Sequence, residues 1–175
     1  MSTTTVTAPV RSRSDPGGGA EAFEDFFLAW HMPVYRALWL VTRNGHEAEE
    51  VMQDAFVRVW ERWDRVRKMD RPEAYLFRTA MNVHRSRVRR ALAAVRRTIG
   101  SVPGDDAIAT IEERDAIVRA MGRLTKAQRA AVVLVDLVGM SSAEAAQALG
   151  VRPPTVRVLA ARGRAVLRDE MGEAR

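Results

Sequence analysis

Six arginines lie within the seventeen residues from Met81 to Arg97, and no carboxylate offsets them. The nearest acidic residues are Glu73 before the segment and Asp105 after it. Each guanidinium presents a planar fork of N–H donors that matches phosphate oxygens, and neutralised phosphates release counterions. The dipole at a helix end accounts for only one or two such cations. The segment therefore favours a nucleic acid as partner, with a protein surface or a membrane as alternatives.

A second basic segment follows Gly150, in the stretch PTVRVLAARGRAVLRDE. The capping pattern SSAE predicts a short helix between Ser141 and Gly150. A short helix, a turn that contains glycine and a longer basic helix are typical of a helix-turn-helix motif. The inward face of the last helix would consist of Val156, Ala160, Gly163 and Leu167. Thr155, Arg157 and Arg162 would then flank an exposed strip of small apolar side chains that faces base edges.

Acidic residues are concentrated in an earlier segment, HEAEEVMQDAFVRVWERW. Its apolar residues have the spacing of an amphipathic helix: Ala48, Val51, Met52, Ala55, Phe56, Val59, Trp60 and Trp63. Burial in a core explains this stripe, and carboxylates in the first turns suit the helix dipole. Gln53 and Asp54 lie off the stripe, where they either remain solvated or bind a partner.

The composition excludes several classes of function. The chain has 175 residues, a formal net charge of +6 and no cysteine, so disulfides and cysteine-ligated zinc are excluded and a cytoplasmic location is expected. No apolar run approaches the roughly 20 residues that span a bilayer, and the first residues lack the apolar core of a signal peptide. The three histidines are scattered, and no catalytic order, phosphate loop or metal-ligand spacing occurs. We therefore expect no enzymatic activity, no cofactor and no metal.

Helical periodicity without useful strand alternation predicts an all-α fold of two small domains. We expect a disordered tail over residues 1–20, a helical domain over 21–97, a flexible linker over 98–110 and a helix-turn-helix domain over 111–175. The tail is rich in Ser, Thr, Pro and Gly, and the linker gathers Gly, Pro and Asp. The helix that carries the arginine segment would begin near Asp70 and Pro72.

With both halves in view, the sequence resembles the bacterial sigma factors of the extracytoplasmic-function (ECF) type, which retain only regions 2 and 4. The segment HEAEEVMQDAFVRVWERW is similar to region 2.2, and RPEAYLFRTAMNVHRSRVRR is similar to regions 2.3 and 2.4. The segment LTKAQRAAVVLVDLVGMSSAEAAQALGVRPPTVRVLAARGRAVL is similar to region 4. The resemblance covers about Phe23 to Leu167, with the three motifs in the order and at the spacing of the family.

This resemblance implies a non-catalytic factor that binds core RNA polymerase and directs promoter recognition and melting. The clamp helices of the polymerase β′ subunit would be bound by Glu50, Gln53 and Asp54, while the first helices of region 4 would lie on the β flap. The minus-ten promoter element would be bound by Tyr75, Arg78, Asn82, Arg85 and Arg89. The minus-thirty-five element would be bound by Thr155, Arg157 and Arg162. An anti-sigma factor is a further partner that the resemblance suggests, and a membrane is not.

The resemblance also implies roles for single positions. Tyr75 would stack on an unpaired base, and the loop DRVRKMDR before it would hold the flipped base. Pro154 stands where the family usually has glycine, and Val158 and Leu159 stand where serine and arginine usually follow, so the upstream element would be recognised unusually or more weakly. The alternatives are a stand-alone helix-turn-helix regulator and a helical adaptor for an acidic protein. The acidic helix argues against the regulator, and the helix-turn-helix motif argues against the adaptor.

Overall fold

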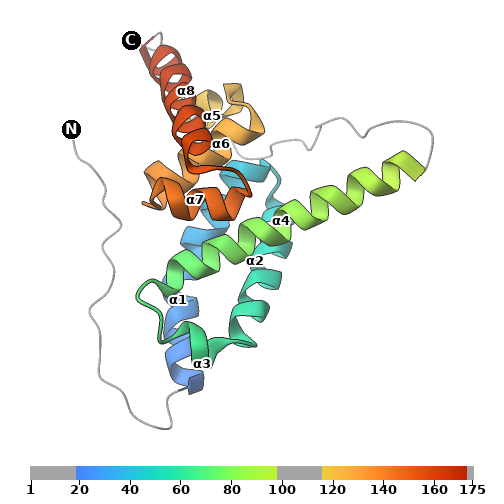
Figure 1. Cartoon of the computed structure of the whole chain (residues 1–175), viewed down its shortest axis with the longest axis vertical. Helices are drawn as coiled ribbons and strands as arrows, with labels where there is room; N and C mark the ends of the chain where they lie inside the picture. Colours follow the sequence, from blue (N-terminus) through green and yellow to red (C-terminus); the bar gives the residue numbers. More distant parts are fainter. Residues whose placement is uncertain (1–18, 98–115, 173–175) are drawn as a thin grey trace.

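The computed structural model describes residues 19–97 and 116–172, which form the first and second halves of the fold. The first half contains α1 (Gly19–Thr42), α2 (Gly45–Trp60), α3 (Trp63–Val66) and α4 (Pro72–Arg97). The second half contains α5 (Ala116–Arg123), α6 (Lys126–Val132), the π-helix η1 (Val133–Leu137), α7 (Ser142–Leu149) and α8 (Pro153–Gly172). These two ranges contain no strand (Figure 1), which confirms the predicted all-α fold. Residues 1–18 of the expected tail and the expected linker lie outside the described residues.

Helix α2 packs against α1 on one side and against α4 on the other. Its predicted apolar stripe is largely buried, and Val51 and Ala55 are fully enclosed. Trp60 does not follow this pattern, because its side chain is 49% exposed. The sequence pattern continued this helix to Trp63, whereas α2 ends at Trp60 and Trp63 begins α3. The turn between the two helices buries Trp63 and leaves Trp60 at the surface, where the centroid of its ring lies 4.8 Å from that of Phe23.

The capping residues that the sequence predicted in the second half are confirmed. Thr125 and Gln128 form a capping box at the start of α6, and Ser141 and Glu144 form another at the start of α7. Gly150 ends α7 in the left-handed conformation with a φ of 65°. These residues fix where the short helix of the helix-turn-helix motif begins and ends.

The segment between α6 and α7 differs from the single α-helix that the sequence predicted. After Val132 the backbone widens into η1, where the Val138 N–H donates to the Val133 carbonyl at 3.0 Å. Hydrogen bonds between residues five apart define a π-helix, and the apolar pattern of this segment does not distinguish it from an α-helix. Gly139, with a φ of 74°, then follows where the sequence placed the end of the helix.

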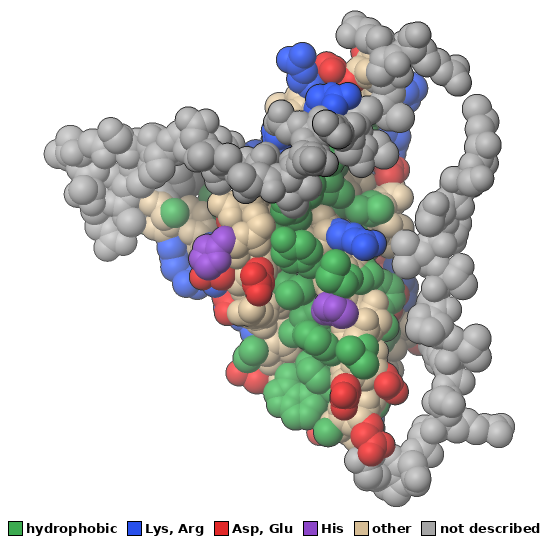
Figure 2. All heavy atoms as spheres, turned by 180° about the vertical axis from the view of Figure 1, so that it is seen from behind, with side chains coloured by type: hydrophobic (Ala, Val, Ile, Leu, Met, Phe, Trp, Pro, Cys, Tyr) green, Lys and Arg blue, Asp and Glu red, His purple; other side chains and the backbone are tan. Residues whose placement is uncertain are grey.

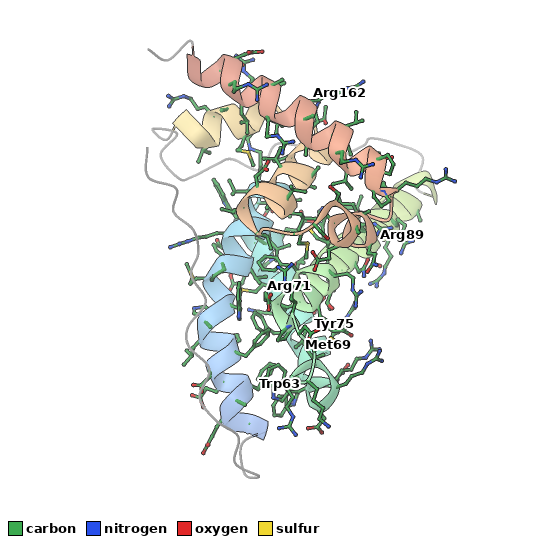
Figure 3. The ribbon with its side chains drawn as sticks, turned by 60° about the vertical axis from the view of Figure 1, so that its left-hand side comes forward. Trp63, Met69, Arg71, Tyr75, Arg89 and Arg162 are labelled. Atoms are coloured by element: carbon green, nitrogen blue, oxygen red, sulfur yellow. The ribbon has the colours of Figure 1, made fainter. Side chains whose placement is uncertain are left out.

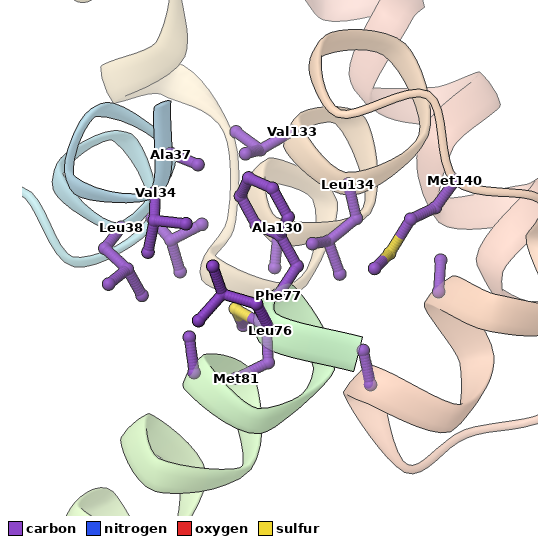
Figure 4. Packing of buried hydrophobic residues seen from close by; sticks show 14 of the residues in the cluster. Val34, Ala37, Leu38, Leu76, Phe77, Met81, Ala130, Val133, Leu134 and Met140 are labelled. Atoms are coloured by element: carbon purple, nitrogen blue, oxygen red, sulfur yellow. The ribbon is translucent and has the colours of Figure 1, made fainter. Parts of the chain in front are cut away.

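The two halves are in contact and share one hydrophobic core. Helix α7 lies against α4, while α6 and η1 lie against α1. Figure 4 shows Phe77 of α4 next to Ala130, Val133 and Leu134 of the second half, with Val34 of α1 nearby. All of these side chains are buried. The predicted arrangement of two domains on a linker did not include this shared core.

Gly163 is a point of close packing between α8 and α6. A Cβ atom at this position would lie 2.6 Å from Val132 Cγ2 and 3.2 Å from Leu124 Cδ2. Crowding a packed core costs about 1–3 kcal/mol, and the helix propensity of alanine returns about 1 kcal/mol at most. We expect Gly163→Ala to lower the free energy of unfolding by about 1 kcal/mol, measured by urea denaturation.

Gly122→Ala is the matched control for this prediction. A Cβ atom at Gly122 would meet only the end of the flexible Arg43 side chain, which can move aside. We expect Gly122→Ala to leave the free energy of unfolding unchanged or to raise it. Equal effects of the two substitutions would contradict the close packing of α8 on α6.

Candidate functional site

An apolar groove lies between α1 and α2, and Val57 and Trp60 are its exposed large apolar side chains. The groove encloses about 470 Å³ and is lined by Ala20, Phe23, Glu24, Phe27, Gln53, Phe56, Val57 and Trp60. Figure 2 shows hydrophobic side chains gathered along one face of the molecule, with acidic side chains beside them. Such a groove can take the apolar face of a partner helix. We call it the α1–α2 groove.

The three residues predicted to bind polymerase are placed in two different environments. Gln53 is exposed and lines the α1–α2 groove. Glu50 and Asp54 instead contact Arg87 of α4, whose Nη2 donates to Asp54 Oδ2 at 2.9 Å while its Nη1 donates to Glu50 Oε2. The carboxylates of Asp54 and Glu50 raise the pKa of Arg87. Both acids remain about half exposed, at 46% for Asp54 and 44% for Glu50, so they can still contact a partner.

A second polar contact joins α2 to α4, in addition to the contacts of Arg87 with Glu50 and Asp54. His84 Nδ1 lies 2.8 Å from Glu47 Oε1, and this hydrogen bond is the main cause of the lowered pKa of Glu47. Asn44 caps the start of α2 by accepting a hydrogen bond from the Glu47 N–H at 3.0 Å. These contacts hold the acidic first turns of α2 in a fixed position against α4.

A polar hollow of about 530 Å³ lies between the end of α2 and the first turns of α4. We call it the arginine hollow, and its lining consists of Arg58, Glu61, Arg62, Tyr75, Arg78, Thr79 and Asn82. The Tyr75 hydroxyl accepts a hydrogen bond from Arg62 Nη1 at 3.2 Å, and this bond raises the pKa of Arg62. The Arg78 guanidinium carbon lies 5.0 Å from the centroid of the Tyr75 ring. Figure 3 shows Tyr75 close to Met69 near the start of α4.

Three of the five residues predicted for the minus-ten element meet in the arginine hollow: Tyr75, Arg78 and Asn82. Arg58 near the end of α2 and Arg62 in the turn that follows that helix lie with them, and the sequence pattern did not single out either residue. The only sequence signal for them is the run of charged residues at the end of that helix. The hollow thus combines three cations and the carboxylate of Glu61 with an aromatic ring and an amide.

Arg85 and Arg89 lie further along α4 and line a different hollow of about 330 Å³. Arg85 Nη1 donates to the Ala148 carbonyl at 3.1 Å, and Arg89 Nη2 donates to the Ser86 hydroxyl at 3.2 Å. Arg89 is exposed, whereas Arg85 is half-buried. Arg85 Nη1 also donates to Asn82 Oδ1 at 3.4 Å, so Arg85 stays in contact with one of the first three predicted residues although it lines a different hollow. The side chains of the last two arginines of the segment, at positions 96 and 97, lie outside the described part of the chain.

Helix α8 exposes all three residues predicted for the minus-thirty-five element: Thr155, Arg157 and Arg162. Figure 3 labels Arg162 along α8. The predicted inward face is confirmed for Val156 and Ala160, which are 0% and 1% exposed. The predicted apolar strip is present at the surface, because Val158 is 48% exposed.

Residues 19–97 and 116–172 contain neither a candidate metal site nor a helix that could span a membrane. Within these ranges no cluster of His, Asp and Glu side chains could hold a metal ion. None of the helices described is long and apolar enough to cross a membrane.

Comparisons with known proteins match both halves of the chain. The model of Sigma-70 region 2 matches residues 26–93, and the model of Sigma-70 region 4 matches residues 114–167. The ECF RNA polymerase sigma factor SigM of Mycobacterium tuberculosis is 35% identical over 156 residues, which cover 89% of this chain and 80% of SigM. The ECF RNA polymerase sigma factor SigW of Bacillus subtilis is 26% identical over 170 residues, which cover 88% of this chain and 91% of SigW.

Two solved structures have a similar arrangement of helices. The sigma factor RpoE from Bartonella quintana, in a co-crystal with the anti-sigma factor NepR, matches with a TM-score of 0.73 and 21% identity. The match covers 89% of this chain and 99% of RpoE, and at this identity it shows the fold alone. CnrH, in complex with the cytosolic domain of CnrY, matches with a TM-score of 0.56 and 25% identity over 90% of this chain and 92% of CnrH.

Proposed function

The chain belongs to the ECF RNA polymerase sigma factors, and on that premise we propose which of its surfaces bind polymerase and which bind the promoter. A protein of this family binds core RNA polymerase and directs it to promoters, so the predicted family and function are confirmed. A stand-alone regulator is not favoured, because region 2 matches as well as region 4. We further propose that the chain acts in the cytoplasm and catalyses no step itself.

The arginine hollow is the observation that carries the proposed promoter contact. Tyr75 offers a ring on which an unpaired base can stack, and stacking tolerates any base. Arg58, Arg62 and Arg78 line the same hollow and outnumber the one carboxylate among its described residues, that of Glu61, so they can neutralise the phosphates of the same strand. The Asn82 amide supplies a donor and an acceptor for a base edge. We place the melted minus-ten strand in this hollow, with Arg85 and Arg89 extending the contact along α4.

The α1–α2 groove is the proposed docking site for the clamp helices of the polymerase β′ subunit. Val57 and Trp60 supply exposed apolar surface for a partner helix, and Gln53 lies in the same groove as a hydrogen-bonding group. Aromatic anchors surrounded by polar groups dominate the binding energy of many protein interfaces. Glu50 and Asp54 lie beside the groove as half-exposed carboxylates that can attract basic residues of the clamp.

Region 4 is proposed to bind the upstream promoter element through Thr155, Arg157 and Arg162 and the β flap through its first helices. The first residues of a recognition helix lie deepest in the major groove. We expect Arg157→Ala to lower promoter affinity of the holoenzyme about tenfold, measured by fluorescence anisotropy of a promoter fragment. The affinity of the variant for core polymerase should stay unchanged, as should both affinities of the control Arg36→Ala, which removes an exposed arginine of α1 that lines neither the arginine hollow nor the α1–α2 groove. An equal loss of promoter and core affinity would contradict the assignment of α8.

Binding to core polymerase tests the proposed function as a whole. The purified chain is expected to co-elute with core polymerase from its own host in gel filtration. A chain that binds DNA but never associates with core polymerase would overturn the proposal. An anti-sigma factor is a further proposed partner, because the similar RpoE was solved in complex with one.

A further inference from the structure

The outward side of α8 carries a line of apolar side chains. Val156 and Ala160, which are 0% and 1% exposed, mark the side of this helix that is buried. Pro154, Val158 and Ala161 follow one another at intervals of four and three residues, which places them together on the opposite side. All three are exposed, and the side chain of Val158 is 48% exposed. We call these three residues the α8 strip.

Exposed arginines lie on either side of the α8 strip. Arg157 lies on one side and Arg162 on the other. Figure 3 shows Arg162 on the outer side of α8. Arg164 is placed differently, because its Nη1 donates to both carboxylate oxygens of Asp136, at 2.9 and 3.2 Å. The strip is therefore bordered by two cations that can reach the phosphate backbones on either side of a DNA groove.

The first turn of α8 adds no unpaired backbone donor to this surface. Pro153 and Pro154 have no N–H group. The N–H groups of Thr155 and Val156 both donate to the Arg152 carbonyl, at 2.9 and 3.3 Å. The backbone donors that a helix start usually offers are thus missing or already paired. The leading end of α8 consequently meets a base edge without main-chain hydrogen bonds.

A surface without hydrogen-bonding groups matches one feature of base edges in the major groove. Thymine presents its 5-methyl group there, whereas the other groups that distinguish the bases are hydrogen-bond donors and acceptors. Contact between an apolar side chain and this methyl group removes apolar surface of both partners from water. Against a donor or acceptor, the same side chain would displace water without replacing its hydrogen bond. The α8 strip is therefore suited to thymine and poorly suited to the other bases.

Val158 is the residue of the strip that is best placed for such a contact. It is bulkier than Ala161 and lies one turn further into the helix than Pro154. Its neighbour Leu159, which also departs from the family pattern, is half-buried and packs against the core. Of the two unusual residues, Val158 is therefore the one that faces a partner.

We infer that Val158 reads thymine methyl groups in the major groove of the upstream promoter element. Pro154 and Ala161 extend this apolar contact along the same side of α8. The inference rests on the proposed function, since it assumes that α8 binds the upstream element. It goes further by assigning to Val158 a base preference that phosphate contacts of the flanking arginines do not supply.

Sequence selection is the first test. Holoenzyme made from the full chain and core polymerase of the host would select from random duplexes long enough to hold both promoter elements. We expect the wild type to enrich thymine at one or more positions of the upstream element, and Val158→Ala to lose this preference while it selects the same downstream element. An upstream element without thymine, no upstream selection at all, or an undiminished thymine preference in Val158→Ala would overturn the inference.

Deoxyuridine tests the methyl group itself, because it lacks only the 5-methyl group of thymidine and keeps the base pair. The selected duplex would carry deoxyuridine either at the enriched positions or at the thymines between the two promoter elements. By fluorescence anisotropy, we expect the wild-type holoenzyme to bind the first duplex about threefold more weakly for each contacted methyl group that is removed. It should bind the second duplex like the unmodified one.

Val158→Ala should bind the unmodified duplex about threefold more weakly than the wild type and should no longer distinguish deoxyuridine from thymidine. An equal loss of affinity for the deoxyuridine duplex in the wild type and in Val158→Ala would overturn the inference. A wild type that binds both duplexes equally well would overturn it too.

Leu28→Ala is the matched control, because it removes an exposed apolar side chain from α1 and leaves α8 unchanged. We expect this variant to keep the wild-type sensitivity to deoxyuridine. Val158→Ala should bind core polymerase like the wild type. A loss of core affinity as large as the loss of promoter affinity would overturn the inference and indicate that the α8 strip contacts a protein. Failure of the wild-type chain to bind core polymerase would instead count against the proposed function.

Discussion

Replacing Trp60 by alanine is expected to weaken binding to core RNA polymerase about thirtyfold, because a central tryptophan is a typical hot spot of an interface. The side chain is 49% exposed, lines the α1–α2 groove and packs against Phe23. Its removal would leave a gap in the apolar surface that the clamp helices are proposed to contact. Competition against a labelled wild-type chain measures the change in affinity.

Leu28→Ala is the matched control for the Trp60 prediction. Leu28 is exposed to 59% on α1 but does not line the groove, so its loss removes apolar surface elsewhere. We expect Leu28→Ala to bind core polymerase like the wild type, and Trp60→Phe to retain most of the affinity. Equal weakening by Leu28→Ala and Trp60→Ala would indicate that polymerase does not use this groove.

Replacing Tyr75 by alanine is expected to reduce promoter opening about tenfold or more, since one base stacked on an aromatic ring contributes about 1–3 kcal/mol. Among the described residues that line the arginine hollow, Tyr75 is the only aromatic one. The fluorescence of 2-aminopurine placed in the minus-ten element measures the open fraction at saturating holoenzyme. Core affinity should stay unchanged, because Tyr75 does not line the α1–α2 groove.

Tyr75→Phe separates the ring from the hydroxyl. This variant keeps the stacking surface and removes only the hydrogen bond from Arg62 to the hydroxyl. We expect promoter opening close to that of the wild type. If Tyr75→Phe lost as much opening as Tyr75→Ala, the hydroxyl contact and not base stacking would explain the role of this residue.

Local features of the fold were predictable because they depend on residues close together in the chain. Ser141 and Glu144 form the predicted capping box, and Gly150 adopts the left-handed conformation that ends α7. Val156 and Ala160 are buried as the helical period required. Each of these features is fixed within one or two turns of helix, so the sequence pattern contains the necessary information.

Features that depend on contacts between distant segments were not predictable. The end of α2 at Trp60 follows from the turn into α3, and the apolar period alone continues to Trp63. The contact of Arg87 with Glu50 and Asp54 joins helices whose relative placement no local pattern encodes. The arginine segment was expected to be free for an external anion.

The arginines are in fact divided among several roles. Arg87 neutralises carboxylates of α2, and Arg85 binds the end of α7, whereas Arg89 is exposed. Charge density indicated the class of partner, but it could not assign an acceptor to each guanidinium. The arginine hollow, which includes Arg58 of α2 and Arg62 of the turn that follows it, could only be found once α2 and α4 were placed side by side.

Run-off transcription tests the central claim most directly. Core polymerase from the host would be combined with the purified chain and sheared genomic DNA, and the starts of the transcripts would be mapped. The account predicts transcripts from discrete start sites that core polymerase alone does not produce. The same set of transcripts with and without the chain, despite binding of the chain to DNA, would contradict its assignment as a sigma factor.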